Sequence, residues 1–144
     1  MAARDKIHGA VKNALIKDGW TITDDPFVIE FKDLELEADM AAERTLAAER
    51  GTERIAVEVK SFLSASPVRD LQQAFGQYEM YRLLLKRIEP DRVVFLAISE
   101  YTWLDFFQRE SVKAIRDATN LRIIVVDIET EEITQWIGKE DTAT

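Results

Sequence analysis

The chain has 144 residues, of which 47% are hydrophobic and 32% are charged, a composition typical of one globular domain with a sizeable core. It contains no cysteine, which excludes disulfide bonds and thiolate metal sites and fits a reducing cytoplasm. Its net charge of −8 argues against indiscriminate binding of nucleic acid, and no apolar run reaches the roughly 18 residues of a membrane span. We therefore expect a cytoplasmic protein that does not span a membrane.

The first part of the chain predicts one helix and several short strands. Residues 3–18 place apolar side chains at helical spacing and end at Asp18-Gly19, which predicts the helix. The strands that follow are separated by turn-forming residues. They comprise residues 20–23, 27–31 and 34–38. Residues 45–62 then predict a β-hairpin whose turn contains Gly51.

The second part of the chain alternates helices with strands. Pro67 fits the first turn of a second helix, which is predicted to run to about Arg87. Residues 103–119 predict a third helix. Its expected buried side chains are Leu104, Phe107, Val112 and Ile115. The predicted strands comprise residues 93–98, 122–128 and 133–137, of which the first two are apolar runs typical of strands covered on both faces.

These elements predict a single α/β domain over residues 1–144. Its core lies in residues 3–137, and residues 138–144 are expected to form a frayed polar tail. No internal repeat or linker interrupts the pattern. The order of helices and strands favours a mixed central β-sheet flanked by helices on both faces.

The second arm of the predicted hairpin carries an acid and a lysine on one face. Side chains alternate along a strand, so Glu58 and Lys60 point to the same side, about 7 Å apart. A metal-dependent phosphodiesterase uses such a pair, because the carboxylate holds Mg²⁺ and the ammonium faces the attacking water or the phosphate. A half-buried antiparallel strand with a charged solvent face has the same pattern.

Asp39 is a candidate to share an ion with Glu58. It lies at the start of the hairpin's first arm, so pairing of the two arms would bring it beside Glu58. Mg²⁺ is usually held by one or two carboxylates, with waters and phosphate oxygens completing the octahedron. Asp39 is alternatively a solvated strand end in an acidic ladder. The rival ligands are Glu35, Glu37 and Glu43.

The second helix places a glutamine within an apolar stripe. Residues at three- and four-residue spacing share one face of this helix. They are Ala74, Gln77, Tyr81, Leu84 and Ile88. Gln77 would need a polar partner if it is buried, such as a phosphate, a water or a lysine. Otherwise Gln77 reaches solvent or caps a backbone carbonyl. Tyr81 is more often a core aromatic residue with its hydroxyl at the surface.

His8 is the only histidine of the chain and borders the apolar stripe of the first predicted helix. A histidine in such a place is usually a packing residue whose polar atoms are satisfied. Its alternative role is that of a proton carrier or an outer partner of a metal.

Several segments of the chain carry a resemblance to known proteins. They are residues 3–6, 11–26, 55–62, 76–77, 81–82, 89–92 and 135–137. Over residues 3–137 the chain resembles the fdxN element excision controlling factor XisH family of cyanobacteria. The order of elements, with Asp39, then Glu58-Val59-Lys60, then Gln77-x-x-x-Tyr81, resembles more broadly the PD-(D/E)xK, or restriction endonuclease-like, nuclease superfamily.

The superfamily resemblance implies roles for these residues. Asp39 and Glu58 would be ligands of Mg²⁺ or Mn²⁺, with the carbonyl of Val59 as a third ligand. Lys60 would be the catalytic lysine. Gln77 and Tyr81 would form the helix motif of the resolvase-like and RecB-like branches. The chain departs from the superfamily at two positions, since Ala38 replaces a proline and His8 stands where the first helix often has glutamate.

The family resemblance implies a role in programmed excision of a DNA element during heterocyst development, together with a site-specific recombinase and a companion factor, XisI. Two hypotheses follow. The chain is a Mg²⁺-dependent endonuclease acting on DNA, with Asp39, Glu58, Lys60 and Gln77 as catalytic residues. Alternatively, it is a catalytically silent control factor that keeps the nuclease fold and binds a protein partner or DNA. A homodimer is plausible by analogy.

Overall fold

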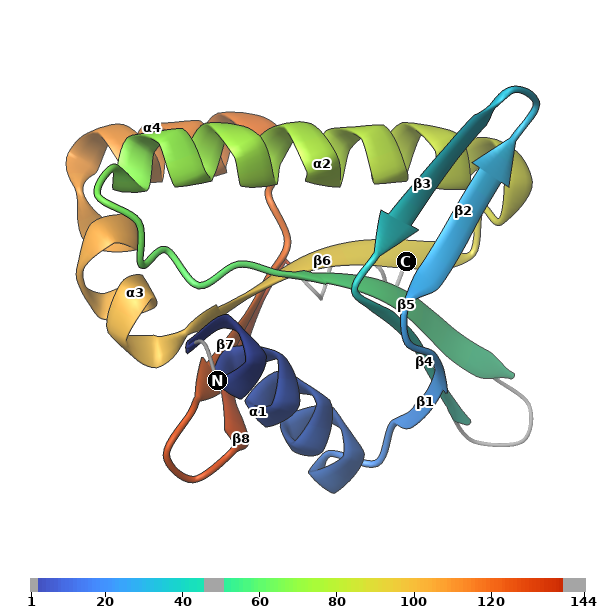
Figure 1. The fold of residues 1–144 in the computed structure, drawn as a ribbon, viewed down its shortest axis with the longest axis horizontal. Helices are drawn as coiled ribbons and strands as arrows, with labels where there is room; N and C mark the ends of the chain where they lie inside the picture. Colours follow the sequence, from blue (N-terminus) through green and yellow to red (C-terminus); the bar gives the residue numbers. More distant parts are fainter. Residues whose placement is uncertain (1–2, 46–50, 139–144) are drawn as a thin grey trace.

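The structure is a computed structural model that describes residues 3–45 and 51–138 (Figure 1). Its helices are α1 (Ala3–Lys17), α2 (Pro67–Ile88), α3 (Glu100–Leu104) and α4 (Glu110–Thr119), with a short 3₁₀ helix, η2 (Phe106–Gln108). Its strands are β1 (Thr21–Asp24), β2 (Phe27–Phe31), β3 (Leu34–Ala38), β4 (Met40–Thr45), β5 (Thr52–Val59), β6 (Arg92–Ser99), β7 (Ile123–Asp127) and β8 (Glu132–Ile137). The predicted α/β class is confirmed.

Six of the strands form the central sheet, in the order β1-β4-β5-β6-β7-β8. The three central strands β5, β6 and β7 run parallel, while β1, β4 and β8 join antiparallel. The sheet is therefore mixed, as predicted. Strands β2 and β3 form a separate two-stranded sheet that packs on α2 (Figure 1).

The sheet separates two hydrophobic cores. On one face, α1 packs over side chains that include Ile55, Val57 and Phe95. On the other face, α2, α3 and α4 cover side chains that include Ala56 and Leu96. Neighbouring residues of β5 and β6 thus enter opposite cores, since side chains alternate along a strand. The two faces of the sheet are both covered, as the apolar run of β6 predicted.

This arrangement decides between the two interpretations of β5. The strand is paired on both sides, with β4 antiparallel and β6 parallel. Glu58 lies on the face covered by α2 and is only 6% exposed. The interpretation of β5 as a half-buried strand with a charged solvent face is therefore wrong.

The helix that covers this face begins where the sequence predicted. Pro67 is the first residue of α2, and Ser66 caps the helix by accepting a hydrogen bond from the N–H of Arg69 at 3.2 Å. The buried face of α2 is rotated slightly from the predicted stripe. It comprises Leu71, Ala74, Tyr78, Tyr81 and Leu85. Leu84 is only partly buried and Ile88 is exposed, because they lie at the edge of this face.

The predicted hairpin is present with a different first arm. Strand β4 ends at Thr45, where the sequence placed the beginning of the arm, and pairs Met40 with Val57. The small residues Ala41 and Ala42 of β4 are fully buried between the sheet and its helices. The part of the prediction that concerns residues 46–50 lies outside the described residues.

The predicted third helix is divided into α3, η2 and α4. Ser99 caps α3 by accepting a hydrogen bond from the N–H of Thr102 at 3.1 Å, so the first helix begins before Trp103. The backbone of Arg109 is extended and separates η2 from α4. On one continuous helix, Phe107 and Val112 would point in different directions, and the break allows both to enter the core. Leu104 and Ile115, expected to be buried, are 65% and 41% exposed.

Two expectations concern the ends of the chain and membranes. Of the predicted frayed tail, residues 139–144 lie outside the described residues. Within residues 3–45 and 51–138, no helix combines the length and the apolar character needed to cross a lipid bilayer.

Candidate functional site

A cavity of about 530 Å³ lies where β5 ends, between α1 and α2. Its lining residues are Ile7, His8, Asp39, Glu58, Val59, Lys60, Ser61, Gln73 and Gln77. The structure thus brings together the four residues predicted as catalytic, Asp39, Glu58, Lys60 and Gln77, from three separate parts of the chain. Two of these parts are adjacent because β4 pairs with β5, and the third is the helix α2 that covers them.

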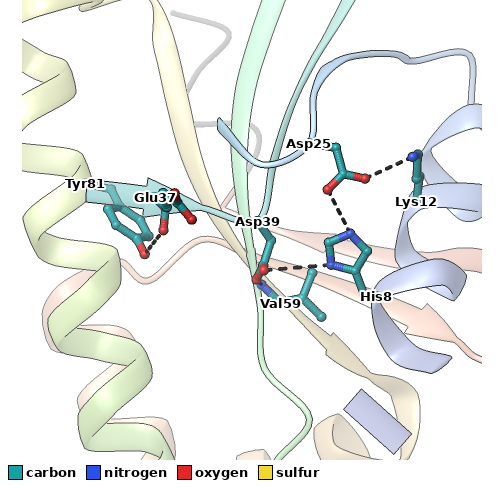
Figure 2. A network of polar contacts seen from close by, with 7 residues as sticks. All are labelled: His8, Lys12, Asp25, Glu37, Asp39, Val59 and Tyr81. Atoms are coloured by element: carbon teal, nitrogen blue, oxygen red, sulfur yellow. Dashed lines mark hydrogen bonds and ion pairs between the residues drawn. The ribbon is translucent and has the colours of Figure 1, made fainter. Parts of the chain in front are cut away.

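Asp39 is held against the end of β5. It lies between β3 and β4, and the pairing of Met40 with Val57 carries it toward Val59. The N–H of Val59 donates a hydrogen bond to Oδ2 of Asp39 at 2.7 Å (Figure 2). Oδ1 of Asp39 lies 3.8 Å from Nδ1 of His8. One carboxylate oxygen is therefore fixed by the backbone of β5.

Glu58 is a buried acid with an unsatisfied oxygen. Its Oε1 has no hydrogen-bond partner in the described part of the chain. Burial, followed by the charge of Asp39, raises the pKa of Glu58 to about 7, against the opposing effects of Lys60 and of the Tyr81 hydroxyl. A buried carboxylate without a partner is costly, so a cation in the cavity would stabilise its charged form.

Lys60 and Gln77 provide polar groups of different kinds. The N–H of Lys60 donates to the carbonyl of Ala97 at 3.1 Å, so pairing with β6 extends past the end of β5 and directs Lys60 into the cavity. Gln77 is half-buried, and its Oε1 has no hydrogen-bond partner among the described residues. The amide therefore borders the cavity with a free acceptor.

Tyr81 lies one turn beyond Gln77 and does not line the cavity. It is 3% exposed, and its hydroxyl donates a hydrogen bond to the carbonyl of Glu37 at 2.7 Å (Figure 2). The expectation of a hydroxyl at the surface is therefore wrong. Burial and then the charge of Glu58 raise the pKa of Tyr81, which keeps the hydroxyl neutral. The hydrogen bond from Tyr81 to Glu37 thus joins the β2–β3 sheet to α2 beside Glu58.

His8 reaches the cavity from α1. Its Nε2 lies 3.1 Å from Oδ1 of Asp25, and Nζ of Lys12 donates to Oδ2 of the same carboxylate at 2.9 Å (Figure 2). The ring is half-buried and lines the cavity rather than entering the apolar core. His8 therefore lies at the wall of the cavity, with a partner for its Nε2.

The rival acids do not line the cavity. Glu43 lies near two arginines of the sheet, with its Oε2 3.5 Å from Arg54 and 3.7 Å from Arg92. Glu35 and Glu37 are exposed on β3. Asp39 is thus the acid of this segment that faces Glu58.

The sequence analysis did not single out Gln73 or Asp25, which the structure places at the site or beside it. Gln73 lines the cavity one helical turn before Gln77, and this spacing was a signal that could have found it. Asp25 had no such signal, because it meets His8 only through the tertiary fold, 17 positions along the chain.

The donor atoms of the cavity suit a hard divalent cation. Mg²⁺ prefers oxygen ligands and keeps several waters, and the carboxylates of Asp39 and Glu58 with the nearby backbone of Val59 are of this type. The free Oε1 of Glu58 adds a buried acceptor that a cation would satisfy. Among residues 3–45 and 51–138, no three acidic, histidine or cysteine side chains form a metal-binding cluster. A bound ion would therefore depend on two side-chain carboxylates, with backbone, water or substrate as its other ligands.

Comparisons with known proteins identify close structural relatives. The family model described as XisH protein matches residues 1–134. An XisH family protein from Nostoc punctiforme PCC 73102 is 42% identical, with a TM-score of 0.84 over 92% of this chain and 99% of its own. A fdxN element excision controlling factor protein from Anabaena variabilis is 44% identical, with a TM-score of 0.84 over 93% of this chain and 99% of its own. No curated protein matches the chain.

Proposed function

Since the chain belongs to the XisH family, we propose that it serves in the programmed excision of a DNA element through a metal-dependent, endonuclease-like site of the PD-(D/E)xK type. Its substrate would be a phosphodiester bond of DNA in the cytoplasm, and its cofactor Mg²⁺ or Mn²⁺. A solved relative from Anabaena variabilis that is named an fdxN element excision controlling factor supports the connection to DNA excision.

The observation that carries the proposal is the convergence of Asp39, Glu58, Lys60 and Gln77 on one cavity. Two acids that can hold a metal ion, an ammonium group and an amide suit the hydrolysis of a phosphodiester. A purely structural role explains this set poorly, because Glu58 and Gln77 each keep a buried oxygen that has no partner among the residues that the structure describes.

Each residue has a distinct part in the proposed reaction. Asp39 and Glu58 would hold the cation, which when bound supplies electrostatic stabilisation of the charge that develops on the phosphate. Lys60 would contact the phosphate or orient the attacking water through its ammonium group. Gln77 would orient the same water or a phosphate oxygen through its amide. Tyr81 and His8 would support the site from outside the reacting atoms.

The proposal is tested by incubating the purified protein with supercoiled, linear and branched DNA, with and without Mg²⁺ or Mn²⁺. We expect cleavage that requires the metal and is lost in Glu58→Ala and in Lys60→Ala. The matched control is Glu35→Ala, which removes an exposed acid outside the cavity. Cleavage that survives both cavity substitutions would come from a contaminant and would end the enzymatic hypothesis.

The second candidate function is that of a catalytically silent control factor. The net charge of −8 favours it, because a predominantly acidic protein repels the negatively charged backbone of DNA. Such a factor would keep the nuclease fold and bind an XisI-like companion, a site-specific recombinase, a second copy of itself, or DNA.

The two candidates are separated by a pull-down with the XisI-like companion, using wild type and the variant with both Glu58→Ala and Lys60→Ala. Retention of the companion and of excision control by the double variant would favour the silent factor. Loss of excision control with retained binding would favour the nuclease.

A further inference from the structure

The His8 ring lies between two carboxylates with unequal contacts. Nε2 is 3.1 Å from Oδ1 of Asp25, which is a hydrogen-bonding distance, whereas Nδ1 is 3.8 Å from Oδ1 of Asp39, which is not (Figure 2). A carboxylate only accepts hydrogen bonds, so the proton of the contact with Asp25 is on Nε2. Nδ1, on the other side of the ring, then points toward Asp39.

Asp25 is itself held in place. Nζ of Lys12 donates to Oδ2 of Asp25 at 2.9 Å, so both carboxylate oxygens of Asp25 have partners. Lys12 and His8 are one turn apart on α1 and reach Asp25 together. Partial burial would raise the pKa of Asp25, but the hydrogen bonds from Lys12 and His8 outweigh it and lower the pKa. The carboxylate therefore stays charged and a strong acceptor.

His8 and Asp39 border the same cavity, so the orientation of the ring decides which of its atoms lies beside the Asp39 carboxylate. Side chains around the carboxylate ligands of a metal orient those ligands, and a carboxylate that accepts from one N–H of a histidine fixes the orientation of the ring. Asp25 stands in that relation to His8.

We propose that Asp25, supported by Lys12, is a positioning residue that orients His8 so that Nδ1 faces the Asp39 carboxylate at the cavity, with His8 as an outer partner of that carboxylate. The inference rests on the proposed function in one respect, since Asp39 is a ligand of the divalent cation at the proposed site. Nothing in the local sequence around Asp25 indicates this role.

The first test observes the orientation of His8 without a metal. His8 is the only histidine of the chain, so every imidazole signal in a ¹H–¹⁵N NMR spectrum belongs to it. A proton on Nε2 is visible in such a spectrum when a hydrogen bond protects it from exchange with water. We expect this signal in wild type and in Asp25→Asn, which retains an acceptor oxygen, and its loss in Asp25→Ala.

The matched control is Asp24→Ala, which removes the same charge from the neighbouring, exposed position. This variant should keep the Nε2 proton signal. A signal that persists in Asp25→Ala would overturn the inference, as would its loss in Asp24→Ala. Unfolding curves of all three variants verify that each is folded.

The second test measures binding of Mn²⁺ by calorimetry, because Mn²⁺ is one of the cations of the proposed site and binds carboxylate ligands. Asp25→Ala should weaken the affinity about 10- to 100-fold, as expected for loss of an outer partner of a metal ligand. Asp25→Asn should recover part of this loss, and Asp24→Ala should bind as wild type does. Unchanged affinity in Asp25→Ala would overturn the role of Asp25 in ligand binding. Wild type that binds no Mn²⁺ would overturn the proposed function, while the proton signal would still decide whether Asp25 positions His8.

Discussion

Val59 and Asp39, 20 positions apart, are joined by a hydrogen bond of 2.7 Å from the N–H of Val59 to Oδ2 of Asp39. Because Val59 follows Glu58 directly, this bond holds two carboxyl groups close together at the end of β5. Their proximity contributes to the raised pKa of Glu58, after the larger effect of burial. The bond therefore connects the local geometry of the strand to the electrostatics of the cavity.

The first prediction concerns the pH dependence of stability. The pKa of Glu58 is about 7 in the folded protein against a reference of 4.5. The folded state thus binds more protons than the unfolded state between these values, and stability falls as the pH rises from 4.5 to 7. The difference between the two pKa values corresponds to a loss of about 3 kcal/mol in the free energy of unfolding at pH 8.

Glu58→Gln should remove this loss, because glutamine cannot ionise. Between pH 4.5 and pH 8 the free energy of unfolding of wild type should therefore fall by about 3 kcal/mol relative to that of Glu58→Gln. Urea denaturation at both pH values measures the effect, with Glu35→Gln as the control for loss of an exposed acid. Parallel pH profiles of wild type and Glu58→Gln would contradict the prediction.

The second prediction concerns the effect of a divalent cation on stability. A ligand that binds only the folded state stabilises it by about 2.7 kcal/mol at 100 times its Kd. Mg²⁺ or Mn²⁺ should therefore raise the Tm of wild type, and EDTA should reverse the change. Glu58→Gln should show little increase, because it loses the charge that attracts the ion. An equal increase in both proteins would place the bound ion elsewhere.

The third prediction concerns the hydrogen bond between Tyr81 and the carbonyl of Glu37. Tyr81→Phe removes a buried donor and leaves the carbonyl without this partner, which should cost about 1–3 kcal/mol. Tyr101→Phe is the matched control, since Tyr101 is 75% exposed and should tolerate the change. Chemical denaturation of the two variants measures the difference. Equal stabilities would show that the contact contributes little to holding the β2–β3 sheet on α2.

The fourth prediction tests the division of the helix predicted at residues 103–119. Phe107 is fully buried, and Phe107→Ala should cost about 3–5 kcal/mol by leaving a cavity in the core. Leu104→Ala should change stability by less than about 0.5 kcal/mol, because Leu104 is exposed. A large loss in Leu104→Ala, measured by thermal unfolding, would instead support one continuous helix.

Much of the fold could be predicted because simple periodic signals govern it. The strands at residues 27–31 and 34–38 have the predicted bounds, and α2 begins at Pro67 as its capping chemistry requires. The apolar run of β6 indicated correctly that both faces of this strand are covered. Local patterns were sufficient in these cases because tertiary packing agrees with them.

Other features depend on packing that no local pattern contains. The break near Arg109 arises because Phe107 and Val112 must enter one core from different helical phases. The buried face of α2 includes Tyr78, which the predicted stripe did not, because neighbouring elements and not the helix alone decide which side chains are covered. Of the candidate site, the grouping of Asp39, Glu58, Lys60 and Gln77 could be expected from motif spacing, whereas the contact of Asp25 with His8 could not.

The cavity receives side chains from both sides of the central sheet. Ile7 comes from α1, which covers one face, and Gln77 comes from α2, which covers the other. An occupant that contacts both helices would couple their stabilities, because local unfolding of either helix would break its contacts with the occupant. Slower amide hydrogen exchange would then spread through α1 and α2 together, and the affinity of the occupant would report on the cohesion of the whole domain.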